Sequence, residues 1–221
     1  MPRLLSLLFL CSMLLFAACN SSTSEETAQK SASTTTTTKP LVGGPCQGCE
    51  AVLEYGDKVL TTIDTLPAFQ ETEPKMKVTG TIYQKDGRTP AAGVILYAYH
   101  TNRKGIYEAK EGAKGWAKTH GFIQGWIKTD QTGQYTFYTF RPAAYPNRAE
   151  PEHIHLTVKE PNRNEYYIES IQFLDDKLLT TEKQQQLRKR GGSGLTTPRL
   201  ENGLLLVKRD IILGMNIPNY E

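Results

Sequence analysis

The chain has 221 residues, of which 38% are hydrophobic, and its formal net charge is +3. This length is enough for one folded domain with ancillary segments. Removing the first 18 residues, whose only charge is Arg3, leaves a charge of +2. Such a balanced charge, without a basic run that is interleaved with aromatic residues, excludes a protein built to bind nucleic acid.

The first 18 residues predict an export signal. Arg3 is followed by an apolar stretch at residues 4–16 and then by two alanines. This is the layout of a secretory signal, and it is too short for a comfortable membrane span. The small residues directly before Cys19 resemble a bacterial lipobox, in which the cysteine is lipidated. We therefore expect an exported protein that is held to a bacterial membrane only through a lipid on Cys19. The alternative is an ordinary cleaved signal with an incidental cysteine.

Residues 19–44 predict a disordered linker. They are mostly serine, threonine and other polar residues of low complexity, and they lack core-forming side chains until the last few positions. Such a segment cannot bury enough apolar surface to fold. A lipid at one end of this linker and a domain at residues 45–221 would make a protein that is tethered to a surface.

Cys46 and Cys49 predict a small disulfide. In an exported protein a C-x-x-C pair is most simply a staple. A thioredoxin-like redox motif would need a βαβ context, and a zinc half-site would need a second pair of ligands; neither follows in the sequence. We expect the disulfide to take no part in a reaction.

Residues 45–221 read as an all-β domain. Asp86 and Gly87 are typical of a hairpin turn. One short helix is predicted at residues 181–190, where Thr181 and Gln184 are spaced as a capping box. Many short antiparallel strands joined by long loops predict a β-sandwich. The predicted strands are residues 76–84, 93–100, 125–140 with a turn at 130–133, 153–158, 165–173 and 204–215.

The stretch "EPEHIHLTV", residues 150–158, places two histidines inside a predicted strand. Successive side chains of a strand point to opposite faces, so His153 and His155 share one face. Their side chains would start about 7 Å apart, which is close enough to converge on a single ion. A histidine pair of this kind is a candidate metal site.

Two tyrosine motifs accompany the histidine pair. "YHTNRKGIY" ends at Tyr107, and "GWIKTDQTGQYTFYTFRPAAYP" contains Tyr145 near its end. In this order and spacing, the three motifs resemble the intradiol ring-cleavage dioxygenases, and the chain resembles their short secreted branch, which is protocatechuate 3,4-dioxygenase-like. The resemblance spans about residues 78–173 and implies the β-sandwich of that family.

The resemblance implies a ferric ion bound by Tyr107, Tyr145, His153 and His155. Phenolate oxygens are hard anionic donors that suit a high-valent iron. A trivalent ion can hold tyrosine as phenolate although free tyrosine has a pKa of about 10. The implied substrates are a small aromatic diol or triol and O2. The diol would displace Tyr145, and the iron would act mainly as a Lewis acid.

Two positions depart from the family pattern. Where the family has an arginine three residues before the first histidine, this chain has Glu150. Where the family often has a glutamine, the alignment places Ser170. A carboxylate opposes developing negative charge, and a cation stabilises it. We therefore expect that Arg148 or Arg141 neutralises Glu150, that the substrate carries a hydrogen-bond donor there, or that turnover is poor.

Two other functions compete with this interpretation. The histidines could join Glu150 or Glu152 in an Fe(II) or Mn(II) site of two histidines and one carboxylate. A regular strand would point Glu152 away from the histidines. Alternatively, the domain could be a transthyretin-like module that binds a ligand without chemistry. His100 and His120 are predicted to be structural or surface groups.

Overall fold

The computed structural model describes residues 41–147 and 149–221, which belong to one compact unit. The predicted signal, Cys19, most of the predicted linker and Arg148 lie outside the described residues. In the described part of the chain, no helix has the length and apolar character to span a membrane.

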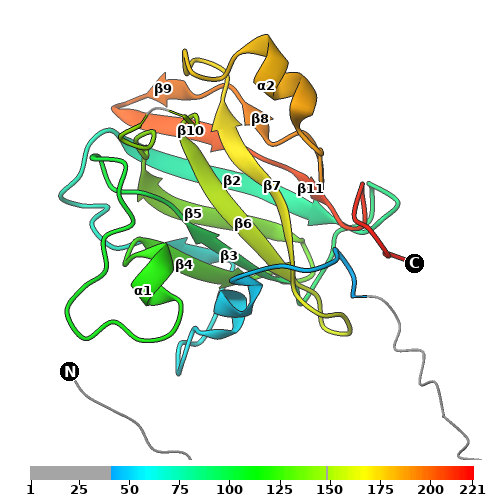
Figure 1. Ribbon diagram of the computed structural model, residues 1–221. Coiled ribbons are helices and arrows are strands. Elements are labelled where there is room, and N and C mark those ends of the chain that lie inside the picture. Colours follow the sequence, from blue (N-terminus) through cyan, green and yellow to red (C-terminus); the bar gives the residue numbers. More distant parts are fainter. Residues whose placement is uncertain (1–40, 148) are drawn as a thin grey trace, which may run out of the picture. The chain divides into compact units, whose positions relative to one another are not determined.

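Two β-sheets stack face to face and confirm the predicted sandwich (Figure 1). The first sheet has the order β1-β5-β2-β10-β9, with β11 also paired to β2, and the second has the order β4-β3-β6-β7-β8. The strands of the first sheet are β1 (Ile63–Thr65), β2 (Lys75–Tyr83), β5 (Gln134–Phe140), β9 (Arg199–Glu201), β10 (Leu204–Lys208) and β11 (Ile211–Ile212). Those of the second are β3 (Ile95–Tyr99), β4 (Gln124–Lys128), β6 (His153–Lys159), β7 (Tyr166–Phe173) and β8 (Leu195–Thr196).

Antiparallel pairings join most strands of the second sheet, as predicted, but only part of the first. They join β2 to β5 in the first sheet and run through β4, β3, β6 and β7 in the second. The pairings of β1 with β5, β10 and β11 with β2, and β8 with β7 are parallel. The first sheet is therefore mixed at its centre as well as at its β1 edge, which corrects the purely antiparallel prediction, and the second sheet is mixed only at its β8 edge.

The hydrophobic core lies between the sheets. Every second residue of β2 is buried, as the alternating sequence requires for a strand with one face on a core. Met76 and Val78 of β2 belong to one buried cluster with Phe137 of β5 and, from the second sheet, Leu96 and Leu156. His153 and His155 alternate with the core residues of β6 and so stand on the outer face of the second sheet.

The predicted hairpin turn at Asp86 and Gly87 is present, but it does not join two long strands of one sheet. The Asp86 carboxylate accepts hydrogen bonds from the backbone N–H groups of Arg88 and Thr89. After a single bridge between Tyr83 and Pro90, the chain crosses to the second sheet. The turn at Asp130 also carries the chain between sheets, from β4 to β5.

The helices differ from the single one that the sequence predicts. The structure has α1 (Ala117–His120), α2 (Thr181–Gln186) and a 3-10 turn at Cys49–Leu53. The predicted capping box is wrong, because Thr180 is the N-cap of α2 and its side chain accepts a hydrogen bond from the Lys183 N–H. The helix ends at Gln186 rather than at residue 190, since Arg190 is buried against the ring of Tyr167.

Candidate metal centre and adjoining cavity

The four residues proposed as ligands meet at one point. The phenol oxygens of Tyr107 and Tyr145 lie 2.9 Å apart. The Tyr145 oxygen is 3.3 Å from Nε2 of His153, and the Tyr107 oxygen is 2.8 Å from Nε2 of His155. The two Nε2 atoms are themselves 3.0 Å apart. These donor atoms form a closed ring of contacts although they come from two loops and one strand.

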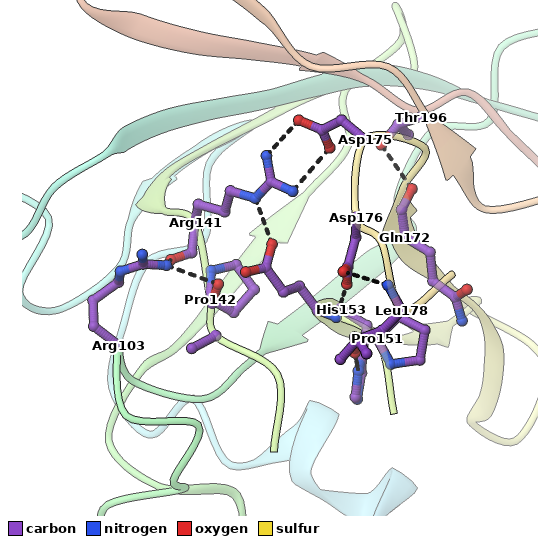
Figure 2. Close-up of polar contacts among 12 residues, drawn as sticks. Arg103, Arg141, Pro142, Pro151, His153, Gln172, Asp175, Asp176, Leu178 and Thr196 are labelled. Atoms are coloured by element: carbon purple, nitrogen blue, oxygen red, sulfur yellow. Dashed lines mark hydrogen bonds and ion pairs between the residues drawn. The ribbon is translucent and has the colours of Figure 1, made fainter. Parts of the chain in front are cut away.

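Two loops that run side by side bring the tyrosines together. Arg103 donates hydrogen bonds to the backbone oxygens of Arg141 and Pro142, and Figure 2 shows this contact. The Thr101 hydroxyl donates to the backbone oxygen of Ala143. Gly105 approaches so closely that a Cβ atom there would lie 2.0 Å from the Ala144 oxygen. The loop that carries Tyr107 is thus fixed against the loop that carries Tyr145.

Arg141 ties the same region to the start of β6. Its guanidinium donates to Glu152 at 2.6 Å and to both oxygens of Asp175 at 2.7 and 2.8 Å, and Figure 2 shows the pair with Asp175. The hydrogen bonds from Arg141 lower the pKa of Asp175. Arg141 therefore does not pair with Glu150, and this part of the sequence-based hypothesis is wrong.

His153 presents an unprotonated nitrogen toward the tyrosines. Nδ1 of His153 donates to the Pro151 backbone oxygen at 2.7 Å, which leaves Nε2 as the unprotonated nitrogen. Burial lowers the pKa of His153 and that of His155, so both rings are neutral at physiological pH. Burial raises the pKa of Tyr107, and the neighbouring Tyr145 raises it further. Without a cation, Tyr107 is therefore a phenol.

This donor set fits a hard, highly charged metal ion. Two ligands bound at about 2.1 Å and at right angles lie about 3 Å apart, which matches the spacing of the four atoms. Phenol oxygens that ionise only beside a cation, together with two imidazoles, suit ferric iron. In residues 41–147 and 149–221, no group of three or more histidine, cysteine or acidic residues could hold a metal. The alternative site with Glu150 or Glu152 is therefore not supported.

A β-bulge places Ser170 beside the site. His155 is the single residue between Ile154 and Leu156, whereas the facing stretch of β7 between Ile168 and Ile171 has two residues. Glu169 and Ser170 thus both lie opposite His155, and the Ser170 hydroxyl is 3.4 Å from Nδ1 of His155. Bulges of this kind re-aim side chains next to active sites.

Glu150 is exposed at the approach to β6. Its negative charge raises the pKa of His153, but burial lowers this pKa by more.

A column of stacked rings supports His155 from the side. Tyr99 pairs with His155 across β3 and β6, and their rings stack at 4.6 Å. His120 stacks on Tyr99 at 3.9 Å, and Trp116 stacks on His120 at 5.2 Å. Sequence reasoning missed this column, and only the pairing of β3 with β6 would have revealed it. His100 is a buried structural group that is bonded to Thr139.

A cavity of about 370 Å³ adjoins His155. Its floor is the outer face of β6 and β7, with His155, Thr157, Tyr167 and Ser170, and Tyr99 forms one side. The facing wall is residues 45–49, which include the predicted disulfide between Cys46 and Cys49. Small-molecule sites typically have volumes of about 300–1,000 Å³, so this cavity suits a compound with one ring.

Comparison with known proteins defines the class. A sequence model described as Dioxygenase matches residues 55–190, which is more than half of the chain. The chain therefore belongs to the intradiol ring-cleaving dioxygenase family. Catechol 1,2-dioxygenase 1 of Acinetobacter lwoffii is 27% identical over 125 residues, which cover 55% of this chain and 38% of that protein. The chain thus matches less than half the length of this curated relative.

Solved structures share the fold. The dioxygenase domain of a carbohydrate-binding fusion protein from Streptomyces sp. SirexAA-E is 20% identical, with a TM-score of 0.52 over 72% of this chain and 90% of that one. Catechol 1,2-dioxygenase from Pseudomonas arvilla C-1 is 16% identical, with a TM-score of 0.54 over 78% and 60%. Hydroxyquinol 1,2-dioxygenase from Pseudomonas putida DLL-E4 is 16% identical, with a TM-score of 0.51 over 82% and 68%.

Proposed function

We propose that the protein is a ferric intradiol dioxygenase that cleaves a small aromatic diol or triol with O2. The observation that carries this proposal is the ring of four donor atoms from Tyr107, Tyr145, His153 and His155, with neighbouring contacts of 2.8–3.3 Å. A ferric ion held there would supply Lewis acidity that makes the bound ring reactive toward O2. The adjoining cavity has the size for a one-ring substrate.

The side chains have distinct roles in this proposal. Tyr107 and His155 contact each other and would remain bound throughout. Tyr145 is followed by the exposed residues Pro146 and Asn147, so its side chain can move outward. If a ferric ion held Tyr145 as a phenolate, its oxygen could accept a substrate proton on leaving and become a phenol. Ser170 lies beside His155 at the cavity floor and can donate a hydrogen bond to a substrate oxygen.

The expected product distinguishes this reaction from others. Intradiol cleavage of catechol breaks the bond between the two hydroxylated carbons and adds one atom of O2 to each of them, so the diol becomes a diacid with two more oxygen atoms. We expect iron-loaded protein supplied with ¹⁸O2 to give cis,cis-muconic acid that carries two ¹⁸O atoms, as measured by mass spectrometry. A hydroxymuconic semialdehyde would contradict the proposal, as would the absence of turnover on both catechol and a trihydroxybenzene. Zinc-loaded protein is the control and should be inactive.

The substrate is proposed to carry a third hydroxyl group. Arg141 is bonded to Glu152 and Asp175, so it does not offset the negative charge of Glu150. A hydroxyl that donates to a carboxylate would turn this charge into a binding contact. One structural relative is named for hydroxyquinol, which is a trihydroxybenzene.

Glu150→Gln is therefore expected to lower the preference for a trihydroxybenzene over catechol. Glu150 is exposed, and two unit charges 4 Å apart in water interact by about 1 kcal/mol. An effect of this size on one substrate would change the ratio of kcat/KM for the trihydroxybenzene to kcat/KM for catechol roughly fivefold. The control is Glu201→Gln, because Glu201 is an exposed carboxylate on β9 of the other sheet. If Glu150→Gln matches this control on both substrates, Glu150 lies outside the substrate site.

The proposed location of the enzyme rests on the sequence. A signal at residues 1–18 and a lipid on Cys19 would place the domain outside the cytoplasm, at the end of the linker of residues 19–44. The disulfide between Cys46 and Cys49 supports an oxidising environment. We therefore propose an enzyme that is tethered to a bacterial membrane and meets its phenolic substrates outside the cytoplasm.

A further inference from the structure

Residues 45–49, which we call the strap, cross the cavity beside His155. Figure 1 shows this stretch as part of the blue segment that lies across the sheet containing β3 and β6. All five strap residues line the cavity, opposite His155 and Ser170. The strap is therefore a wall that the β-sheet does not provide.

The strap is fixed at both ends. Before it, the Val42 backbone exchanges two hydrogen bonds with the Asn164 side chain, and Arg190 donates to the Gly43 oxygen at 2.9 Å. After it, the indole N–H of Trp126 donates to the Ala51 oxygen at 2.9 Å. Between these anchors, the disulfide is the one covalent restraint on the strap.

The strap also contacts the stacked rings that end at His155. Gly48 has a positive φ of 83°, and a Cβ atom there would lie 2.7 Å from Nε2 of His120. His120 stacks on Tyr99, which stacks on His155. Glycine is required because both the backbone conformation and the close approach exclude a side chain. The disulfide therefore fixes the shape of the strap by joining two of its own residues, and the contact of Gly48 with His120 fixes where this loop lies against the stacked rings.

We infer that the strap is the specificity-determining wall of the cavity, and that the Cys46–Cys49 disulfide holds this wall in place. This inference rests on the proposed function, because it treats the cavity as the substrate site. A dithiol would release the wall: two electrons and two protons pass to the disulfide, the S–S bond breaks, two cysteine thiols form, and the dithiol becomes a cyclic disulfide. In this inference the strap does no chemistry in ring cleavage.

The kinetic test uses the full iron-loaded chain with both cysteines replaced, Cys46→Ser together with Cys49→Ser. We expect KM for catechol to rise about tenfold while kcat stays within about twofold. The wall contacts the bound substrate and the transition state equally, so losing it weakens the binding of both by the same amount. The rate on 4-tert-butylcatechol relative to catechol should rise about tenfold, since the released wall admits a bulkier ring. Visible absorption should not change. Unchanged KM and unchanged discrimination would overturn the inference, as would a fall in kcat and colour at constant KM.

A pair of glycine variants tests the contact between the strap and His120. Gly48→Ala keeps the disulfide but drives a methyl group into His120, so KM should rise. Gly44→Ala is the matched control, because Gly44 has a φ of 71° and a Cβ atom there would meet nothing within 4 Å. An equal rise of KM in both variants would attribute the effect to backbone strain and would overturn the role of the His120 contact.

Amide hydrogen exchange of the metal-free protein separates this inference from the proposed function. Adding a dithiol should speed exchange at residues 44–49 about tenfold or more and leave β6 and β7 unchanged, because only the strap loses its restraint. Unchanged exchange at these residues would overturn the inference whatever the activity. If the strap responds but the iron-loaded wild type does not turn over catechols, the proposed function fails and the disulfide-held wall stands.

Discussion

Tyr107→Phe is expected to remove the visible absorption of the iron-loaded protein and to lower kcat/KM for catechol by roughly a thousandfold, or about 4 kcal/mol. The phenylalanine keeps the ring but removes the oxygen that contacts both Tyr145 and Nε2 of His155. Without this hard donor, the remaining set favours softer divalent ions. Metal analysis and absorbance titration with ferric ion measure the loss. His155→Ala should have the same outcome, because it removes a nitrogen donor from the same ring of contacts.

The matched control is Tyr135→Phe. Tyr135 is a buried tyrosine of β5, in the other sheet, and its hydroxyl donates to the Arg209 backbone oxygen at 2.6 Å. Its loss should cost about 1 kcal/mol of stability and leave colour and activity unchanged. Retained colour in Tyr107→Phe and in His155→Ala would show that the ligand assignment is wrong.

The histidine pair was predictable because strand geometry alone determines it. Alternation places His153 and His155 on one face of any regular strand, and the structure brings their Nε2 atoms within 3.0 Å. The sandwich was also predictable, since the burial pattern of β2 follows its sequence pattern. Both features depend on local periodicity, which a single sequence displays directly.

Features that depend on long-range pairing were not predictable in the same way. The stacking of Tyr99 on His155 requires that β3 pair with β6, and no local pattern specifies this partner. The β-bulge opposite His155 adds one residue to β7. A sequence alignment therefore cannot decide whether Glu169 or Ser170 occupies the position beside His155. The strap shows the same limit. The sequence predicts the disulfide between Cys46 and Cys49, but its place above the cavity follows from anchors such as Asn164, more than 100 residues away.

The end of α2 shows how a tertiary contact overrides a local signal. The polar stretch at residues 181–190 has the composition of a helix, yet Leu187 is extended and Lys189 has a positive φ of 56°. This path buries Arg190 against Tyr167 and lets Arg188 donate to the Tyr167 hydroxyl at 2.7 Å. Tyr167 also lines the cavity, so the early end of the helix supports the cavity floor.

Gly105→Ala is expected to weaken ferric binding at least about a hundredfold although Gly105 is no ligand, because shifts of about 1 Å in a supporting shell are enough to spoil a site. Gly105 has a φ of 75°, and an added Cβ atom would lie 2.0 Å from the Ala144 oxygen and 3.2 Å from Cα of Tyr145. These are backbone atoms, so the loops that carry Tyr107 and Tyr145 must separate. The contact of 2.9 Å between the two phenol oxygens would be lost.

Gly112→Ala separates this loss of contact from backbone strain. Gly112 lies in the same loop with a φ of 73°, and a Cβ atom there would meet nothing within 4 Å. Both variants bear the cost of a left-handed alanine, about 1–2 kcal/mol. Only Gly105→Ala also separates the tyrosines, so thermal unfolding should show a loss of stability in both variants, and titration with ferric ion should show weaker binding in Gly105→Ala alone. If the two variants bind iron equally well, the close approach of the loops does not assemble the metal centre, and Tyr107 and Tyr145 must be positioned by their own ring contacts with His155 and His153.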